Sequence, residues 1–317
     1  MRGESGGGRV SALTGADPPP VARALTRFRR AAWIGWRAAG RGVIEFAKSD
    51  NLTFAASIAY YSLLSFFPFI LIVLTVLSRL AIGQGGAGVV TVLNRALPER
   101  FEFLSDQVQQ LAQAPIQLSL IGTLVTLWAS MGVFGAVTSA VNHAWGVEQP
   151  LGFFKHKLIA FLMMLAAGLL LVAALLLSGA IQVVESSWFA GVVEGYPWLL
   201  ELRRLVYRYS LTPTFIFVVG LVYYYAPNAQ VRLRDVWVGA VIAGLLWRGA
   251  FEAFAWYVGA TSRSITVHGS LGTVVAFLGW VYLSAVILLY GVEVTAAYAR
   301  LRKHLPQQAP AAPTREG

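Results

Sequence analysis

Two opposite charges stand four residues apart inside a long apolar stretch of the sequence. Arg248 and Glu252 fall on one face of a helix, and the small residues Ala240 and Gly244 precede them on that face. A charge inside a membrane-spanning helix costs about 2.5–3.5 kcal/mol by insertion scales, so this pair is predicted to face protein or a water-filled cavity. Small residues let a neighbouring helix approach closely. The pair is either a structural ion pair that fixes helix packing or a charged element of a substrate or ion path.

A third charge, Glu293, lies near the end of the last apolar run, after Tyr290 and Gly291. Because a helix rises 1.5 Å per residue, Glu293 should lie about 10 Å nearer to the membrane surface than Arg248. Direct pairing between the two is therefore not expected. Two roles stay open for Glu293: an acid that bonds to the end of a neighbouring helix, or a group that takes part in gating or proton coupling.

Polar side chains also line the first two apolar runs. In the first run they are Asp50, Ser57, Tyr60, Tyr61 and Ser65, and in the second they are Ser119, Thr123, Thr126, Ser130 and Asn142. Pro68 removes one backbone hydrogen bond and frees the carbonyl of Leu64, which predicts a kinked helix. Freed backbone is tolerated at membrane depth where protein or water satisfies it. The stripes either make hydrogen bonds between packed helices or line a cavity.

No constellation for catalysis or metal binding is apparent in the sequence. The four histidines, His143, His156, His268 and His304, are scattered without acids at ligand spacing, and the chain has 0 cysteines. No GxSxG or HExxH motif lies in any of the apolar runs, and the nucleotide-binding loop GxxxxGK[ST] does not occur. We therefore expect no catalytic residues, no metal and no cofactor, and the chain is predicted not to be an enzyme.

The composition shows which elements must carry these residues. Of the 317 residues, 57% are apolar and 13% are charged, against roughly 25% charged in an ordinary soluble domain. So few charges could not solvate the surface of a soluble globule, and a disordered chain would leave too much apolar surface in water. The remaining class is an integral membrane protein.

Six apolar runs are each long enough to cross the hydrocarbon core as a helix. They cover about 52–77, 118–141, 158–184, 205–225, 236–258 and 270–298. They do not alternate with period 2, which excludes the strands of a membrane β-barrel. The sequence predicts an all-α polytopic membrane domain over 50–300 with six transmembrane helices and both termini on one side. The first, second, fifth and sixth spans are the predicted walls of any central cavity.

Residues 23–48 are predicted to form an amphipathic helix at the membrane interface. Its basic face carries Arg30, Arg37, Arg41 and Lys48, and its opposite face carries Phe28, Trp36, Ala39, Val43 and Phe46, while Arg29, Ile34 and Ile44 break the pattern. This combination suits anionic lipid headgroups better than nucleic acid. The segment 1–22, rich in Gly, Pro, Ser and Arg, and the segment 301–317, which contains three prolines, are predicted to be disordered tails. One or two short helices are expected in the long loop 78–117.

Lysine and arginine are unevenly distributed between the two sides of the predicted bundle. They gather in the N-terminal segment, in the C-terminal tail and in the loops that carry Lys155, Lys157, Arg232 and Arg234. The positive-inside rule therefore predicts that both termini are cytoplasmic.

Several segments carry a resemblance to a known family. They are AASIAYYSLLSFFP at 55–68, AVNHAW at 140–145, GSLG at 269–272, WVYL at 280–283 and YGVE at 290–293. In this order and spacing they resemble the YihY/BrkB (virulence factor BrkB) family of bacterial inner-membrane proteins, over about residues 45–300. The resemblance implies a six-helix inner-membrane protein without a settled activity. The family often has an acid before a base in the fifth span, whereas here Arg248 precedes Glu252.

The resemblance also carries an old ribonuclease label, which the scattered histidines and acids do not support. The leading hypothesis is a transporter or exporter of a small or amphipathic substrate, with a cavity lined by Tyr61, Arg248 and Glu252. The alternative is a non-enzymatic envelope scaffold or lipid-handling protein. The predicted partners are the lipid bilayer and its anionic headgroups, with no nucleic acid, and a homo-oligomer or a partner protein stays open.

Overall fold

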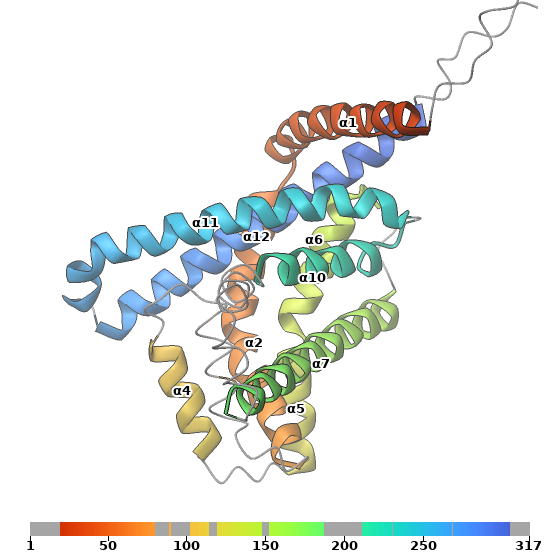
Figure 1. The fold of residues 1–317 in the computed structure, drawn as a ribbon. Helices are drawn as coiled ribbons and strands as arrows, with labels where there is room; N and C mark the ends of the chain where they lie inside the picture. The colour runs from red at the N-terminus through yellow and green to blue at the C-terminus, as the bar shows by residue number, and fades with distance from the viewer. Residues whose placement is uncertain are drawn as a thin grey trace, which may run out of the picture.

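The computed structural model describes residues 20–79, 89, 102–113, 119–147, 152–186, 211–229, 231–267 and 269–304. Within these ranges the chain is built from helices and contains no strand, so the all-α prediction is confirmed (Figure 1). The helices are α1 (Pro20–Lys48), α2 (Asn51–Arg79), α4 (Glu102–Gln113), α5 (Leu120–Ser130), α6 (Gly132–Ala144), α7 (Phe153–Ser186), α10 (Leu211–Tyr225), α11 (Leu233–Val267) and α12 (Gly269–His304).

Five stretches of the described chain are long and apolar enough to cross a membrane. They are Asn51–Leu77, Leu120–Ala144, Phe153–Leu176, Leu233–Tyr257 and Gly272–Arg302. These match five of the six predicted spans. The remaining span, predicted over 205–225, is represented by the shorter apolar helix Thr212–Tyr225, and residues 205–210 lie outside the described part of the chain. The chain is therefore a multi-pass membrane protein.

The predicted single span at 118–141 is divided into two helices by a turn at Met131. In a continuous helix the amide of Val133 would donate to the carbonyl of Ala129. Instead, the Ser65 hydroxyl of α2 lies between them: it donates to Ala129 O at 2.9 Å and accepts from Val133 N at 3.1 Å. Gly132 provides the space, because a Cβ there would press against Ser65 Oγ. The sequence prediction missed this break, since it depends on a residue of another helix.

Helices α11 and α12 form an antiparallel pair (Figure 1). The two helices approach closely at two glycines. A Cβ on Gly239 of α11 would overlap the side chain of Thr295 and the backbone of Gly291 on α12. A Cβ on Gly291 would in turn overlap Ala243 and the hydroxyl of Tyr223 from α10. Tyr223 donates to the carbonyl of Leu288 at 2.6 Å. Three helices are thus fixed together at one crossing.

The main apolar core lies where α2, α6, α10, α11 and α12 meet. Further along the α11–α12 pair, an aromatic group continues this core. Phe215 stacks on Trp247 with ring centroids 4.4 Å apart, and Trp280 contacts Trp247, Phe251 and Phe254. A packed apolar centre is therefore shared by α2, α11 and α12, three of the four predicted cavity walls. Helix α6, one half of the divided second span, also contributes to it.

Helix α1 packs along the C-terminal part of α12 (Figure 1). Its contact face is formed by Ile34, Ala38 and Gly42, which are buried one helical turn apart. Gly42 lies so close to Val294 that a Cβ would press against its side chain. Ile34, which seemed to break the amphipathic pattern, is therefore the residue that contacts protein.

The rest of the α1 surface divides into two sectors that no described residue covers. Among residues 33–48, whose side chains the structure describes, the exposed large apolar side chains are Trp33, Trp36, Val43 and Ile44. The exposed basic side chains in the same range are Arg37, Arg41 and Lys48. Arg37 lies over the ring of Trp33, with its Cζ 4.6 Å from the ring centroid. A helix with apolar, basic and protein-facing sectors side by side suits the boundary between a bundle and lipid headgroups.

Helix ends differ from the predicted tails by a few residues. Helix α1 begins at Pro20, in agreement with the preference of proline for the first helical turn. Helix α12 continues to His304, four residues into the predicted tail 301–317. Arg302 accounts for this, since it bonds to the buried carboxylate of Asp235 on α11 at 2.6 Å. Residues 1–19 and 305–317 lie outside the described chain.

The predicted loop 78–117 contains the short helix α4, which packs against α2. Val108 of α4 and Val89 are fully buried in a second apolar cluster with Ile70 and Leu77 of α2. A prediction of one or two short helices is thus confirmed for α4, and residues 90–101 lie outside the described chain.

Candidate functional site

Glu293 is a buried carboxylate inside the last span. Its side chain is on α12, only 3% of the residue is exposed, and it lies within the membrane-spanning stretch Gly272–Arg302. Oε1 accepts hydrogen bonds from Asn51 Nδ2 at 2.9 Å and from Ser49 Oγ at 3.3 Å. Asn51 is the first residue of α2, so Glu293 is bonded to the end of a neighbouring helix, one of the two roles left open by the sequence.

The turn between α1 and α2 holds these donors in place. Helix α1 ends at Lys48, and the single hydroxyl hydrogen of Ser49 is shared between the carbonyl oxygen of Glu45, at 2.9 Å, and the more distant Glu293 Oε1. Asn51 Nδ2 also contacts Ser49 Oγ, at 2.5 Å. The N-terminus of a helix carries a partial positive charge, which favours a carboxylate such as Glu293 beside it. A sharp turn between two helices therefore directs neutral donors and a helix dipole at one acid.

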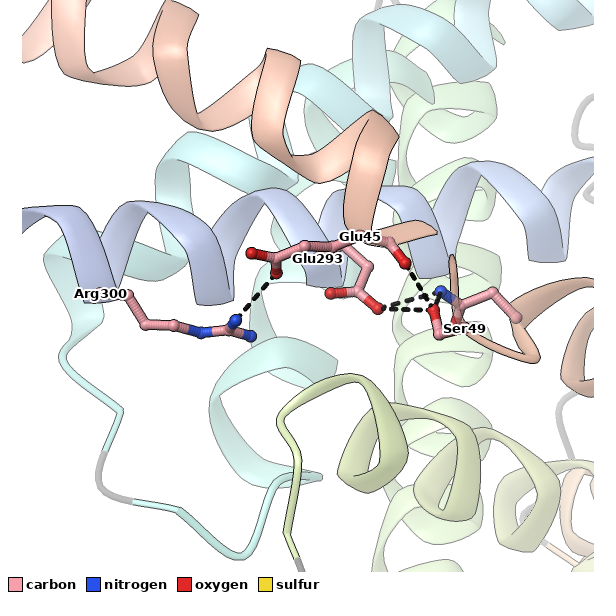
Figure 2. Close-up of polar contacts among 5 residues, drawn as sticks. Glu45, Ser49, Glu293 and Arg300 are labelled. Atoms are coloured by element: carbon pink, nitrogen blue, oxygen red, sulfur yellow. Dashed lines mark hydrogen bonds and ion pairs between the residues drawn. The ribbon is translucent and has the colours of Figure 1, made fainter. Parts of the chain in front are cut away.

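An ion pair borders this arrangement. Arg300, two turns beyond Glu293 on α12, bonds to Glu45 of α1 at 2.9 Å (Figure 2). We call the five residues Glu45, Ser49, Asn51, Glu293 and Arg300 the Glu293 cluster. Arg300 neutralises Glu45, and within the described chain no cation makes an ion pair with Glu293. The cluster as a whole therefore keeps one negative charge when Glu293 is ionised.

One polar atom of the Glu293 cluster is left without a partner. Asn51 is fully buried, and its Oδ1 has no hydrogen bond to any described residue. Both hydrogen bonds to the Glu293 carboxylate end on Oε1. Buried polar atoms of proteins are nearly always hydrogen-bonded, and an exception in a polar cluster indicates a missing ligand or proton.

Arg248 and Glu252 bond to each other but are not enclosed by the bundle. Their side chains are 24% and 62% exposed, although the NH2 group of Arg248 reaches Oε1 of Glu252 at 2.5 Å. Gly244, one turn earlier on the same ridge, is buried against Ile216 of α10. The ridge thus faces protein at Ala240 and Gly244, as predicted, but is exposed at Glu252. Glu252 is therefore not enclosed by protein, and the water-filled cavity that was the other predicted environment of the pair stays a prediction.

Asn142 is engaged in a connection between helices. Its Nδ2 donates to Thr138 O at 2.8 Å and to Ala226 O at 3.1 Å, and its Oδ1 accepts from Asn228 N at 2.7 Å. Asn228 Oδ1 accepts in turn from Lys155 at 2.8 Å. Asn142 therefore ties the end of α6 to the turn that follows α10, and every hydrogen-bonding position of its amide except one lone pair is used.

The remaining predicted site residues lie on α2 or just before it. Asp50 is exposed in the turn before the helix, and Tyr60 and Tyr61 are 58% and 43% exposed, with their rings 5.5 Å apart. Tyr61 also contacts Gly132 at the break between α5 and α6. Pro68 lies inside α2, fifteen or more residues from the Glu293 cluster along the helix. Asp50 lies in the turn between Ser49 and Asn51, beside the Glu293 cluster, whereas the structure shows no contact of Tyr60, Tyr61 or Pro68 with Arg248, Glu252 or Glu293 among the described residues. The place of all four along a substrate path stays a prediction.

Sequence reasoning identified Glu293 but missed its partners. Asn51 and Ser49 are 242 and 244 positions away along the chain, and Glu45 and Arg300 are separated by 255. An asparagine directly after a predicted interfacial helix was the available signal, since such residues begin helices. Across the described ranges, no three histidines, aspartates or glutamates come together as a metal site.

Comparisons with known proteins agree in placing the chain among one group of membrane proteins. Residues 43–315 match the family described as Virulence factor BrkB. The ribonuclease-like protein YfkH of Bacillus subtilis is 28% identical over 259 residues, which cover 81% of this chain and 92% of YfkH. A UPF0761 membrane protein of Aliivibrio salmonicida is 27% identical over 254 residues, 78% of this chain and 79% of the relative.

A UPF0761 membrane protein of Legionella pneumophila is 26% identical over 264 residues, and the chain spans only 61% of that relative's length. No solved structure matches the chain significantly. The family match includes both the α1–α2 turn and Glu293, and it extends over most of the sequence. The chain belongs to the Virulence factor BrkB family of membrane proteins.

Proposed function

We propose that this protein is a transporter or exporter of a small or amphipathic substrate. The observation that supports this is Glu293, a carboxylate buried inside a span with neutral donors around it and no ion-pair partner in the described chain. Ionisable residues inside membrane spans are costly, and they typically mark substrate paths, ion paths or proton relays. A scaffold would gain nothing from an uncompensated charge at this position.

The divided second span gives further support. Transporters often use interrupted helices, whose freed ends serve substrate and ion sites near mid-membrane. The break at Met131 is about halfway along the stretch Leu120–Ala144, and Ser65 joins both halves to α2. Helix α2 also carries Asn51, so the interrupted span and the Glu293 cluster are connected through one rigid element.

We further propose that the protein lies in the bacterial inner membrane with both termini in the cytoplasm. The concentration of lysine and arginine near both ends of the chain supports this orientation. The exposed basic and apolar sectors of α1 then face the anionic headgroups of the cytoplasmic leaflet.

We propose that the protein is not a nuclease, although one relative is named ribonuclease-like. A metal-dependent nuclease needs clustered acids or histidines to hold its ions. The described acids Glu293, Asp235 and Glu252 are instead each bonded to a separate partner. Incubation of the purified protein with a structured RNA and Mg²⁺ is expected to leave the RNA intact, and cleavage that co-purifies with the protein would contradict this.

Lipid handling is the second candidate, favoured by the exposed apolar sector of α1 with Trp33 and Trp36. These side chains would sit among headgroups and acyl chains, where a lipid could be presented to the bundle. A fluorescent phospholipid in reconstituted vesicles tests this candidate, since protein-dependent movement of the lipid between leaflets would favour it over transport of a soluble compound.

Transport itself is tested with the protein in sealed vesicles of phosphatidylethanolamine and phosphatidylglycerol. Vesicles are loaded separately with a cationic, an anionic and a neutral amphipathic dye, and release is followed with and without a pH gradient. Protein-dependent release of at least one dye is the expected result. Equal release of all three from protein-containing and protein-free vesicles would contradict the proposal.

A further inference from the structure

The buried atom of the Glu293 cluster that lacks a hydrogen bond to any described residue, Asn51 Oδ1, is suited to accept one hydrogen-bonded proton. Asn51 presents Nδ2 to Glu293 Oε1 at 2.9 Å, and the Oδ1 of the same amide is buried without a hydrogen bond in the described chain. An amide and a protonated carboxyl form a reciprocal pair, in which the amide N–H donates to one carboxyl oxygen and the carboxyl O–H donates to the amide oxygen. The first of these two hydrogen bonds is present, and the second forms when the carboxyl group turns its protonated oxygen toward Asn51 Oδ1.

We propose that Glu293 is a proton-binding site whose proton is shared with Asn51. A proton taken from water bonds to Oε2, the carboxylate becomes a neutral carboxyl, and its O–H is donated to Asn51 Oδ1. No electron transfer is involved. The new hydrogen bond satisfies the one buried atom of the cluster that lacks a partner, and it removes the uncompensated charge from the interior of the span.

The arrangement favours a proton over a metal cation. A hard cation such as Mg²⁺ or Ca²⁺ requires about six or more oxygen ligands. Here the groups that surround Glu293 direct hydrogens toward it: Asn51 Nδ2 and the Ser49 hydroxyl both approach Oε1. Asn51 Oδ1 is then the single buried oxygen in the cluster that is free to accept, which is what one proton needs.

Other charged groups border the cluster without occupying this position. On α1, Glu45 is paired with Arg300 of α12 at 2.9 Å, and Lys48 is exposed. In the turn, Asp50 is exposed, and on α6 His143 is exposed and stacks on Phe54, one turn beyond Asn51. Of these charged groups and Glu293, Glu293 alone makes a hydrogen bond to Asn51 and can form the acid–amide pair.

Protonation has a mechanical consequence at the α1–α2 turn. The ionised Glu293 accepts a hydrogen bond from Asn51 at the N-terminus of α2 and another from Ser49 at the end of α1. Loss of its charge weakens the attraction to the α2 dipole and the hydrogen bonds that Ser49 and Asn51 Nδ2 donate to it, while Asn51 gains a second hydrogen bond, from the carboxyl O–H to its Oδ1. The proton thus shifts the balance between contacts to α1 and contacts to α2. A role as the coupling ion rests on the proposed transport function, but the proton site itself does not.

Infrared difference spectroscopy of the protein in phosphatidylethanolamine–phosphatidylglycerol bilayers tests the proposal without any transport substrate. The pH is changed in steps, and the C=O stretching region of protonated carboxyls is followed. We expect a band that titrates and is lost in Glu293→Gln. The band should persist in Asp106→Asn, a matched acid-to-amide change at an exposed residue of α4.

A second variant covers the case in which Glu293→Gln fails to fold. Asn51→Leu keeps the acid but removes both amide partners at nearly the same volume, so the carboxyl band is expected to shift to higher frequency. A band that is unchanged in Glu293→Gln or in Asn51→Leu would overturn the assignment. A band that disappears on addition of Na⁺ at constant pH would overturn it in favour of a metal-ion site.

The spectroscopic result separates the two proposals. A titrating Glu293 band without dye flux would leave the proton site intact and remove the transport function. Dye flux without a Glu293 band would do the reverse.

Discussion

At the residue scale, the hydroxyl of Ser65 shows how one side chain can stabilise an interrupted membrane helix. Backbone groups freed inside a span must find partners within the protein, since lipid offers none. Ser65 provides both of them at once, by donating to Ala129 O and accepting from Val133 N, and only 1% of it is exposed. Met131 and Gly132 can therefore leave the helical path without leaving unsatisfied groups in the membrane.

Ser65→Ala is expected to destabilise the protein by about 1–3 kcal/mol, the usual cost of a buried donor or acceptor left without a partner. Ser57→Ala is the matched control on the same helix, because the Ser57 hydroxyl bonds to Thr53 O of its own helix at 3.1 Å. Unfolding followed by tryptophan fluorescence in detergent should show a lower midpoint for Ser65→Ala alone. Equal midpoints for the two variants would contradict the role of Ser65.

Arg248 and Glu252 give a second prediction at this scale. Arg248→Gln leaves the Glu252 carboxylate without its partner in a membrane helix, and the amount of protein in the membrane is expected to fall. The double variant with Glu252→Gln removes both charges and should restore that amount. Restored protein with restored dye flux indicates a structural pair, and restored protein without flux would place the pair on the substrate path.

At the element scale, close approach of helices decides the architecture of the bundle. Helices α11 and α12 touch backbone to backbone at Gly239 and Gly291, and the Tyr223 hydroxyl of α10 reaches the same place. Without a hydrophobic driving force between helices in lipid, such contacts supply van der Waals packing and hydrogen bonds. The position of Glu293, two residues after Gly291, follows from this crossing.

Gly239→Ala should force α11 and α12 apart, because its methyl group would overlap Thr295 and the backbone of Gly291. Overpacking of this kind costs about 1–3 kcal/mol or more. Gly249→Ala, ten residues further along α11, is the control: nothing lies within 4 Å of the new methyl group, and alanine is favoured over glycine in a helix by roughly 0.5–1 kcal/mol. The thermal midpoints of the two variants should move in opposite directions, and a shared direction would argue against the close crossing.

At the scale of the whole molecule, the number and extent of the apolar helices could be predicted from the sequence because their cause is local. Each long span needs only about 20 successive apolar residues, and the five long stretches fall close to their expected positions. The break at Met131 could not be predicted in this way, because it is compensated by Ser65 from another helix.

The candidate site shows the same difference between features with a local cause and features that depend on helix packing. Glu293 was evident as a charge in an apolar run, whereas its bond to Asn51 joins positions 242 residues apart and depends on how α1, α2 and α12 pack. Glu252 was expected to face protein or a water-filled cavity, and its exposure of 62% could not be read from the sequence, because enclosure depends on which neighbouring helix packs against that turn of α11.

The proposed orientation can be tested on the whole molecule with reporters at both ends. Fusions of a reporter that is active only in the cytoplasm to the N-terminus and to the C-terminus should both be active, because lysine and arginine are enriched in these regions. An alkaline phosphatase fusion within 78–117 should be active, since that loop is expected outside. Activity of the cytoplasmic reporter at one end only would show an odd number of crossings.

The central claim is that the buried carboxylate of Glu293 works in transport. Its most direct test is dye flux through vesicles that contain Glu293→Gln or Asp106→Asn, matched acid-to-amide changes at a buried and an exposed position. The variants are first adjusted to the same amount of folded protein per vesicle. We predict that Glu293→Gln loses flux driven by a pH gradient while Asp106→Asn retains the flux of the unaltered protein. Undiminished flux through Glu293→Gln would contradict the claim.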